Sequence, residues 1–274
     1  MNRADVTELQ KRLTAAGFPC VVDGIEGPET RTQTIEWWVS SGRAVVDDSP
    51  SAALAALRAL DVPTSIEERN ARAAGRVPVL DARDAYTGKT YPARSWNTVD
   101  TVCLHQMAAK GSIGWRRWTG LAAHWAVCCD GVAAWLIDFD RRVPHAHGWN
   151  ARSVGFEIEG HYAGVEGDPK THWVPAGATG ERAVPMVLGG PVIEAALDAI
   201  RFTVARVAEH GGKVRYMVAH RQSYGVKASD PGEAIWKQIA LFAMAEHGLV
   251  GLDPVGTGKP IPEAWGGAKG VPYR

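Results

Sequence analysis

A chain of 274 residues is longer than one average domain, and we expect one large and one small domain. Hydrophobic residues make up 46% of the sequence and charged residues 22%, which is typical of a soluble globular protein with a sizeable core. Basic and acidic residues both number 30, giving zero formal net charge, and no apolar run approaches the roughly 18 residues of a membrane span. We therefore expect neither a nucleic-acid partner nor insertion into a membrane.

The first sixty residues predict three short helices. Residues 5–17 carry apolar side chains at helical spacing and end at Gly17, a suitable C-cap. Pro28 suits the first turn of a second helix, which runs to about residue 41, and leucines recur over residues 51–60. We expect a small all-α three-helix bundle over residues 1–62, followed by a polar linker over residues 63–76.

This N-terminal stretch resembles the peptidoglycan-binding domain of many cell-wall hydrolases. The matching residues are Leu9-Gln10, Leu13, Gly17, Asp23-Gly24-Ile25, Gly27-Pro28 and Thr30. Trp37-Trp38 replaces the family's usual Phe-Gln, and a second Asp-Gly turn is degraded to Val46-Asp47-Asp48. The resemblance implies that this domain binds peptidoglycan, and an accessory bundle without a ligand is the alternative.

From residue 77 the sequence changes to short apolar runs separated by turns. Strands are predicted at 77–80, 99–104, 154–158 and 214–218, and a hairpin at 122–137 around the turn Asp130-Gly131. Helical periodicity covers residues 191–210 and 234–247. This order indicates an α/β domain over residues 77–250, a mixed central β-sheet flanked by helices. Residues 251–274 are rich in Gly and Pro, and we expect them to form a loosely held tail.

The loop from His220 to Gly232 carries an imidazole at one end and a carboxylate, Asp230, near the other. It follows a predicted strand and contains enough Gly, Ser and Pro to bring the two groups together. Both groups are ordinary zinc ligands, and catalytic zinc sites use three protein ligands with one open position. The alternative is a structural histidine at a strand end, followed by a turn that starts a helix.

The third ligand has a good candidate in His105, which also follows an apolar strand. Three other histidines compete for this role. His124 lies in the hairpin, and His145 and His147 are two residues apart, so that in an extended segment they would share one face and could hold a metal by themselves.

Four segments of the large domain carry a second resemblance. They are Leu104-His105-Gln106-Met107-Ala108; Ala123 to Val127 with Asp130-Gly131; His145-Ala146 with Asn150 to Glu157; and Ala219-His220-Arg221 with Asp230-Pro231-Gly232. In this order they resemble the zinc-dependent N-acetylmuramoyl-L-alanine amidases, a type shared by phage lysozyme-amidases, bacterial anhydro-muropeptide amidases and peptidoglycan recognition proteins.

The resemblance implies that His105, His220 and Asp230 bind Zn²⁺, that Glu157 is the general base, and that Lys227 stabilises the oxyanion. Bound zinc lowers the pKa of water to roughly 7 and polarises a carbonyl. A nearby carboxylate can take the proton of the water, and an ammonium group stabilises charge that develops near the transition state.

Two assignments carry alternatives. Lys227 lies three positions before Asp230, whereas the bacterial members have their lysine two positions before, where this chain has Ala228. Arg221 or Ser229 are the other candidate donors. Glu159 competes with Glu157, since the two share a strand face, and Glu157 is preferred because it follows Gly155-Phe156 as the glutamate of the family does.

The groove for the glycan or stem peptide has four candidate residues, which are His124, His145, Trp149 and Asn150. For each, a packing or supporting role is the alternative.

Together these features predict a monomeric, two-domain hydrolase that cuts the amide between N-acetylmuramic acid and L-alanine in bacterial peptidoglycan. Residues 1–5 lead directly into a helix pattern without a signal peptide. We therefore expect synthesis in a host cytoplasm and holin-assisted release, as for a phage or prophage endolysin. A non-catalytic peptidoglycan recognition protein and a zinc endopeptidase of the stem peptide are the alternatives.

Overall fold

The first unit of the chain, Met1–Val77, contains the three predicted helices: α1 (Arg3–Ala15), α2 (Pro28–Ser40) and α3 (Pro50–Ala59). The computed structural model describes residues 1–15, 20–40, 49–59, 79–109, 114–165, 171–172 and 179–266, so the expected linker lies outside the described residues. Helices α1 and α3 share a small core, formed by Leu9, Leu13, Ala53, Leu54 and Leu57.

Buried Gln10 explains the polar part of the N-terminal motif. Its side-chain NH₂ donates to Asp23 Oδ1 (2.8 Å) and Thr30 Oγ1 (3.0 Å), and its Oε1 accepts from the backbone N–H of Gly24 (2.9 Å). Gly24 has φ +74°, which a side chain would strain. One amide from α1 therefore holds the turn that precedes α2.

The second unit, Pro78–Arg274, is built on a seven-stranded sheet. Its order is β1-β4-β3-β5-β2-β6-β7, and every neighbouring pair is parallel except the β3–β4 hairpin. The strands are β1 (Leu80–Asp81), β2 (Thr101–Gln106), β3 (Trp125–Val127), β4 (Ala133–Trp135), β5 (Ser153–Ile158), β6 (Tyr216–Ala219) and β7 (Val250–Gly251). The α/β fold and the hairpin predictions are confirmed, and Gly131 takes φ +83° in the turn.

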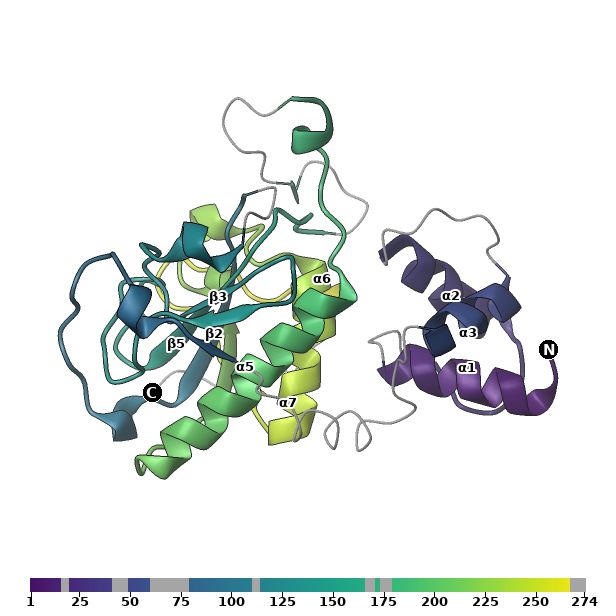
Figure 1. The fold of residues 1–274 in the computed structure, drawn as a ribbon, viewed down its shortest axis with the longest axis horizontal. Helices are drawn as coiled ribbons and strands as arrows, with labels where there is room; N and C mark the ends of the chain where they lie inside the picture. The colour runs from purple at the N-terminus through teal and green to yellow at the C-terminus, as the bar shows by residue number, and fades with distance from the viewer. Residues whose placement is uncertain are drawn as a thin grey trace. The chain divides into compact units, whose positions relative to one another are not determined.

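Helices cover one face of this sheet (Figure 1). The long helix α5 (Gly190–Glu209) packs there beside α6 (Glu233–Ile235), one π-helical turn (Trp236–Ala240) and α7 (Leu241–His247). Alternation along β2 sends Val102 and Leu104 into this core. Cys103 points to the opposite face, where it packs with Trp149 and Leu252 under loops. The second face, covered by loops rather than helices, therefore receives the odd-numbered residues of β2.

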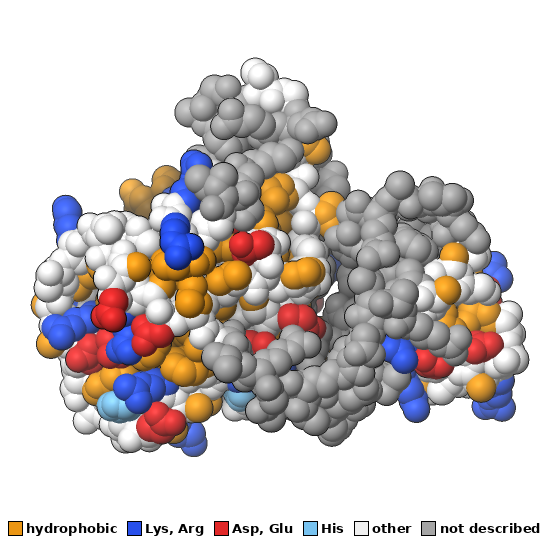
Figure 2. Space-filling view, viewed as in Figure 1, with side chains coloured by type: hydrophobic (Ala, Val, Ile, Leu, Met, Phe, Trp, Pro, Cys, Tyr) orange, Lys and Arg blue, Asp and Glu red, His pale blue; other side chains and the backbone are white. Residues whose placement is uncertain are grey.

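None of the helices in the described ranges combines the length and the apolar character needed to cross a membrane. On the face of the second unit seen in Figure 2, acidic and basic side chains are interspersed among apolar ones, as expected for zero formal net charge.

The prediction of a loosely held tail is wrong for the described residues 251–266. The backbone N–H of Val255 donates to Gln222 O (2.9 Å), and that of Lys259 donates to Arg221 O (2.7 Å). Trp265 is fully buried in the helix-side core. Gly258 lies where an added Cβ would meet the Gln222 backbone, so this glycine allows a close contact between two backbones.

Candidate metal centre

His105 occupies the centre of the sheet. It lies near the carboxyl end of β2, which is hydrogen-bonded to β5 on one side and β6 on the other, and its direct partner in β5 is Glu157. As an odd-numbered residue of β2 it points to the loop-covered face, and its side chain is completely buried. The pairing with Glu157 in the β2–β5 ladder fixes the position of its backbone.

His220 and Asp230 approach the same point from the loop after β6. His220 Nδ1 donates to Asp230 Oδ2 (2.8 Å), and Asp230 Oδ1 accepts the backbone N–H of Gln106 (2.9 Å). The imidazole rings of His105 and His220 have centroids 4.3 Å apart. One donor atom from each of His105, His220 and Asp230 lies within 4.8 Å of the other two.

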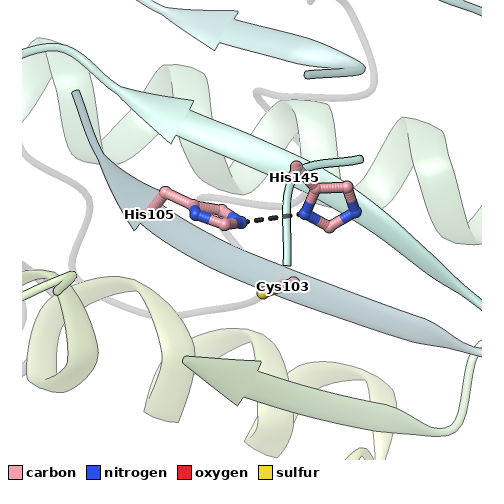
Figure 3. Close-up of side chains that lie close together, drawn as sticks. All are labelled: Cys103, His105 and His145. Atoms are coloured by element: carbon pink, nitrogen blue, oxygen red, sulfur yellow. Dashed lines mark hydrogen bonds between the residues drawn. The ribbon is translucent and has the colours of Figure 1, made fainter. Parts of the chain in front are cut away.

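The described residues contain a second group of three donors, formed by Cys103, His105 and His145 (Figure 3). All three of its side chains are buried, and burial raises the pKa of the Cys103 thiol well above its usual value, so that it stays protonated. In the first group, by contrast, the side chains of His220 and Asp230 are 14% and 13% exposed. Only the first group has a face that a substrate can reach.

The donor set of the first group fits zinc. Two imidazoles and a carboxylate form the three-ligand pattern of a catalytic zinc site. Nδ1 of His105 is buried and has no hydrogen-bond partner among the described residues, as a nitrogen reserved for a metal would. Burial and the neighbouring His220 hold the pKa of His105 well below its usual value, which keeps the imidazole in the neutral form that binds metals.

Glu157 lies beside this donor set. Its Oε1 is 3.7 Å from Nδ1 of His105, and its side chain is 17% exposed. Burial and the charge of Asp230 raise the pKa of Glu157 well above its usual range, while the Lys227 ammonium opposes that rise. The carboxylate is therefore a stronger base than one in water.

Glu159 is directed elsewhere. It follows the end of β5, and its Oε2 accepts the backbone N–H of Cys129 at 2.8 Å. Strand alternation predicted one shared face for the two glutamates, but the regular strand ends at Ile158, and Gly160 follows Glu159 with φ +135°. Of the two, Glu157 alone lies beside His105.

The three candidate oxyanion donors of the loop differ in their surroundings. Lys227 ends a short turn, is exposed, and lies near enough for its charge to act on the pKa values of His105 and Glu157. The Arg221 guanidinium lies 4.7 Å from the ring centroid of Trp265, and the carbonyl of Ser229 accepts from the Gln106 side chain at 2.5 Å. Arg221 thus has a side-chain contact and Ser229 a backbone contact; both residues are half-buried, whereas Lys227 is exposed.

The four expected groove residues lie mainly in the interior. His124 and Trp149 are fully buried; His124 Nδ1 accepts from Gly155 N (3.0 Å), and Trp149 packs on Cys103. His145 is buried against His105. Asn150 Oδ1 accepts the backbone N–H of Ala146 (2.7 Å), closing the turn between them. The buried positions favour the supporting role over groove contact for His124, His145 and Trp149.

Sequence reasoning missed several residues that support the centre. Buried Gln106 links three segments, since its backbone contacts Asp230 and its side chain contacts Ser229 and Tyr162. Its position directly after His105 was the one signal that could have pointed to it.

Half-buried Arg94 is a second residue of this kind. It donates to the carbonyls of Phe139 (2.8 Å), Asn150 (3.0 Å) and Ser153 (2.9 Å), and burial lowers its pKa to about 10. These bonds tie together the loops that cover the second face of the sheet, and no local pattern in the sequence marks the residue that makes them.

The C-terminal segment also supports the loop that carries His220 and Asp230. Buried Gln222, two residues after His220, donates its side-chain NH₂ to Leu252 O (2.5 Å), and Gly225 N donates to Thr257 Oγ1 (3.2 Å). A Cβ added at Gly258 would collide with the carbonyl oxygen of Gln222. We call residues 252–259 the C-terminal clamp.

Comparison with known proteins finds a family model that matches the second unit. This model, described as N-acetylmuramoyl-L-alanine amidase, covers residues 93–233, just over half of the chain. A curated relative, the GTPase Obg of Desulforudis audaxviator (strain MP104C), is 27% identical over 139 residues, which are 50% of this chain and 31% of that protein. The chain thus spans under a third of the length of that relative.

Three solved structures of low sequence identity also match. The N-acetylmuramoyl-L-alanine amidase LysC from Clostridium intestinale URNW is 14% identical, with a TM-score of 0.39 over 60% of this chain and 96% of its own. Drosophila peptidoglycan recognition protein SA is 13% identical, with a TM-score of 0.42 over 65% and 95%. The Ph2119 endolysin from Thermus scotoductus MAT2119 bacteriophage Ph2119 is 16% identical, with a TM-score of 0.37 over 59% and 99%.

Proposed function

Because the chain belongs to the N-acetylmuramoyl-L-alanine amidase family, we propose that it hydrolyses the amide bond between N-acetylmuramic acid and L-alanine in bacterial peptidoglycan. Its cofactor would be Zn²⁺, held by Nδ1 of His105, the imidazole of His220 and the carboxylate of Asp230. The observation that carries the proposal is the convergence of these three donors beside Glu157 at the carboxyl end of the sheet.

The residues divide the chemistry between them. When bound, zinc supplies the positive charge that polarises the scissile carbonyl and acidifies water. Glu157 takes a proton from the attacking water at its carboxylate and passes it to the departing nitrogen of L-alanine. The C–O bond forms first, and the C–N bond breaks as the nitrogen takes up the proton. With the second proton of the water also transferred to the nitrogen, the products are a lactyl carboxylate and an ammonium group on L-alanine. The Lys227 ammonium hydrogen-bonds the oxygen on which negative charge develops.

The test combines metal content with product analysis on purified peptidoglycan. The protein should carry one zinc per chain and release stem peptides with a free L-alanine amino group, which mass spectrometry identifies. Products with intact muramoyl-L-alanine linkages would show an endopeptidase instead. Binding to the wall without any release in the presence of zinc would show a recognition protein.

Ligand variants test the metal assignment separately from catalysis. His105→Ala and Asp230→Ala should lose the zinc, because two remaining donors hold it far more weakly than three. Asp84→Ala, which removes an exposed carboxylate from a surface turn, is the matched control and should retain stoichiometric zinc. Full zinc in Asp230→Ala would contradict the ligand set.

We further propose that the N-terminal unit holds the enzyme on the wall, as expected of a phage or prophage endolysin. Its motif residues Gln10, Asp23 and Thr30 form one hydrogen-bonded turn, which supports the resemblance to wall-binding domains. Removing residues 1–60 should weaken sedimentation with cell walls while hydrolysis of a small soluble muropeptide continues. Equal loss of both would indicate a folding role.

A further inference from the structure

A line of hydrogen bonds leads away from the metal side of His105 into the interior. Nε2 of His105 lies 2.9 Å from Nδ1 of His145, as the dashed line in Figure 3 shows. On the far side of the His145 ring, Nε2 lies 3.0 Å from Ser153 Oγ and 3.4 Å from the Ser153 carbonyl oxygen. The Ser153 hydroxyl in turn donates to the carbonyl of Trp149 at 2.8 Å. We call the line through His105, His145 and Ser153 the relay.

The carbonyl groups of Trp149 and Ser153 determine which atoms of the relay donate hydrogen bonds and which accept them. A serine hydroxyl has one hydrogen, and the Trp149 carbonyl can only accept it, so Ser153 Oγ accepts from His145. Nε2 of His145 therefore carries the hydrogen, which also suits the Ser153 carbonyl beside it. In the neutral His145 ring Nδ1 is then the acceptor, and Nε2 of His105 must donate. The reverse direction would place the lone pair of His145 Nε2 against that carbonyl oxygen.

We propose that His145 and Ser153 are positioning residues that hold His105 as its Nε2–H tautomer, so that the lone pair of Nδ1 faces the metal centre. Within the described part of the chain, Nδ1 is the very atom of His105 that is buried without a hydrogen-bond partner. The other ring nitrogen of a metal-bound histidine usually donates to an oxygen acceptor, and that bond sets which nitrogen binds the metal. Here an imidazole nitrogen fills the acceptor role.

Packing keeps the relay in place. His145 lies over Gly155, where an added Cβ would come within 2.6 Å of both Cγ and Nδ1 of the ring. Gly155 pairs with Cys103 in the β2–β5 ladder, so the ring of His145 sits above two adjacent central strands. The absence of a side chain at Gly155 gives the second imidazole its space.

The first measurement concerns the metal-free protein and needs no assumption about activity. Long-range ¹H–¹⁵N correlation spectra of the histidine rings should show His105 and His145 each as the Nε2–H tautomer. Ser153→Ala removes the hydroxyl acceptor and should raise the population of the Nδ1–H tautomer of His145. An Nδ1–H tautomer of His105 in the unsubstituted protein, or unchanged spectra in Ser153→Ala, would overturn the relay.

The second measurement is zinc affinity, by competition with a chelator, and this consequence rests on the proposed function. His145→Phe fills the site without an acceptor and should weaken zinc binding by about 10–100-fold. His145→Asn offers an amide oxygen near the former Nδ1 and should recover most of that loss, which a purely space-filling role would not produce. Wild-type affinity in His145→Phe contradicts the relay.

The two proposals fail in distinguishable ways. If the unsubstituted protein binds no zinc, the proposed function is wrong, while the tautomer spectra still decide the relay. If His145→Phe does not fold, as judged by its thermal transition, the spectra of Ser153→Ala test the relay in its place.

Discussion

His105 lies inside strand β2 with hydrogen-bonded strands on both sides, whereas His220 and Asp230 lie on a loop beyond the end of β6. The first of these proposed ligands, His105, is fully buried, and its position is set by the register of the sheet. The other two are held by contacts from distant segments, namely Gln106 and the C-terminal clamp. The two halves of the candidate metal centre thus depend on different structural contacts.

The difference predicts different sensitivities. A ligand in a central strand moves only if the sheet itself is disrupted, because many backbone hydrogen bonds must break together. A ligand on a loop moves when one clamping contact is lost, at the cost of about 1 kcal/mol per hydrogen bond. Substitutions outside the centre should therefore disturb the loop-borne ligands first.

The largest expected effect on the rate of hydrolysis comes from replacing Glu157, the proposed base on strand β5. Glu157→Ala should keep its zinc, since Glu157 is not among the proposed ligands, and should lose about 10²–10⁴-fold in rate, the usual contribution of a general base. Release of stem peptides from soluble muropeptide gives the rate, and metal analysis gives the zinc. Glu159→Ala is the matched control and should retain the rate per folded molecule, because its carboxylate contacts Cys129 instead. The opposite pattern would assign the base to Glu159.

A smaller effect is expected from the clamp. Gly258→Ala places a methyl group against the Gln222 carbonyl and should displace the loop. A misplacement of about 1 Å can cost up to about 10²-fold in rate, and overpacking costs about 1–3 kcal/mol in stability. Gly190→Ala, where the added Cβ meets nothing within 4 Å, is the control. Equal rates in the two variants would show that the clamp does not position the loop.

The strands that carry His105 and Glu157 were predicted from the sequence and are present as β2 and β5. Apolar runs before His105 and around Glu157 identified two strands, and period-two alternation then determines the faces of their residues. The contacts of Gln222 with Leu252 and of Arg94 with three carbonyls join segments far apart in the chain. Local patterns carry no information about such pairs, which explains why residues 251–266 were misjudged.

Replacing Lys227, on the loop after β6, should lower the rate of hydrolysis less than replacing Glu157, on strand β5. Lys227 is exposed, so water and salt screen its ammonium more strongly than they screen a group in a closed site. Lys227→Met should therefore lower the rate by no more than about 10²-fold, the lower end for an oxyanion donor, with zinc retained. Activity measured against salt concentration checks this explanation, since the unsubstituted enzyme should lose rate with added salt while Lys227→Met should not. If Lys227→Met lost as much rate as Glu157→Ala, Lys227 would contribute as much to catalysis as Glu157.

The smallest effect concerns the pH dependence of stability in the metal-free protein. Burial lowers the pKa values of His105, His124 and His145, the last to about 3. Below pH 6.5 the unfolded chain binds protons that the folded chain excludes, so the free energy of unfolding falls as the pH drops toward 3. Each histidine contributes at most about 1.4 kcal/mol per pH unit.

Urea unfolding at a series of pH values between 7.5 and 4.5 measures this slope. His124→Gln removes one buried ring, which faces Arg94 and the Arg141 carbonyl, and should make the slope shallower by up to about 1.4 kcal/mol per pH unit. His147→Gln removes an exposed ring and controls for the loss of a histidine as such. Parallel curves for the unsubstituted protein and His124→Gln would mean that this ring takes up its proton without unfolding, and that the covered face of the sheet admits water more readily than its burial implies.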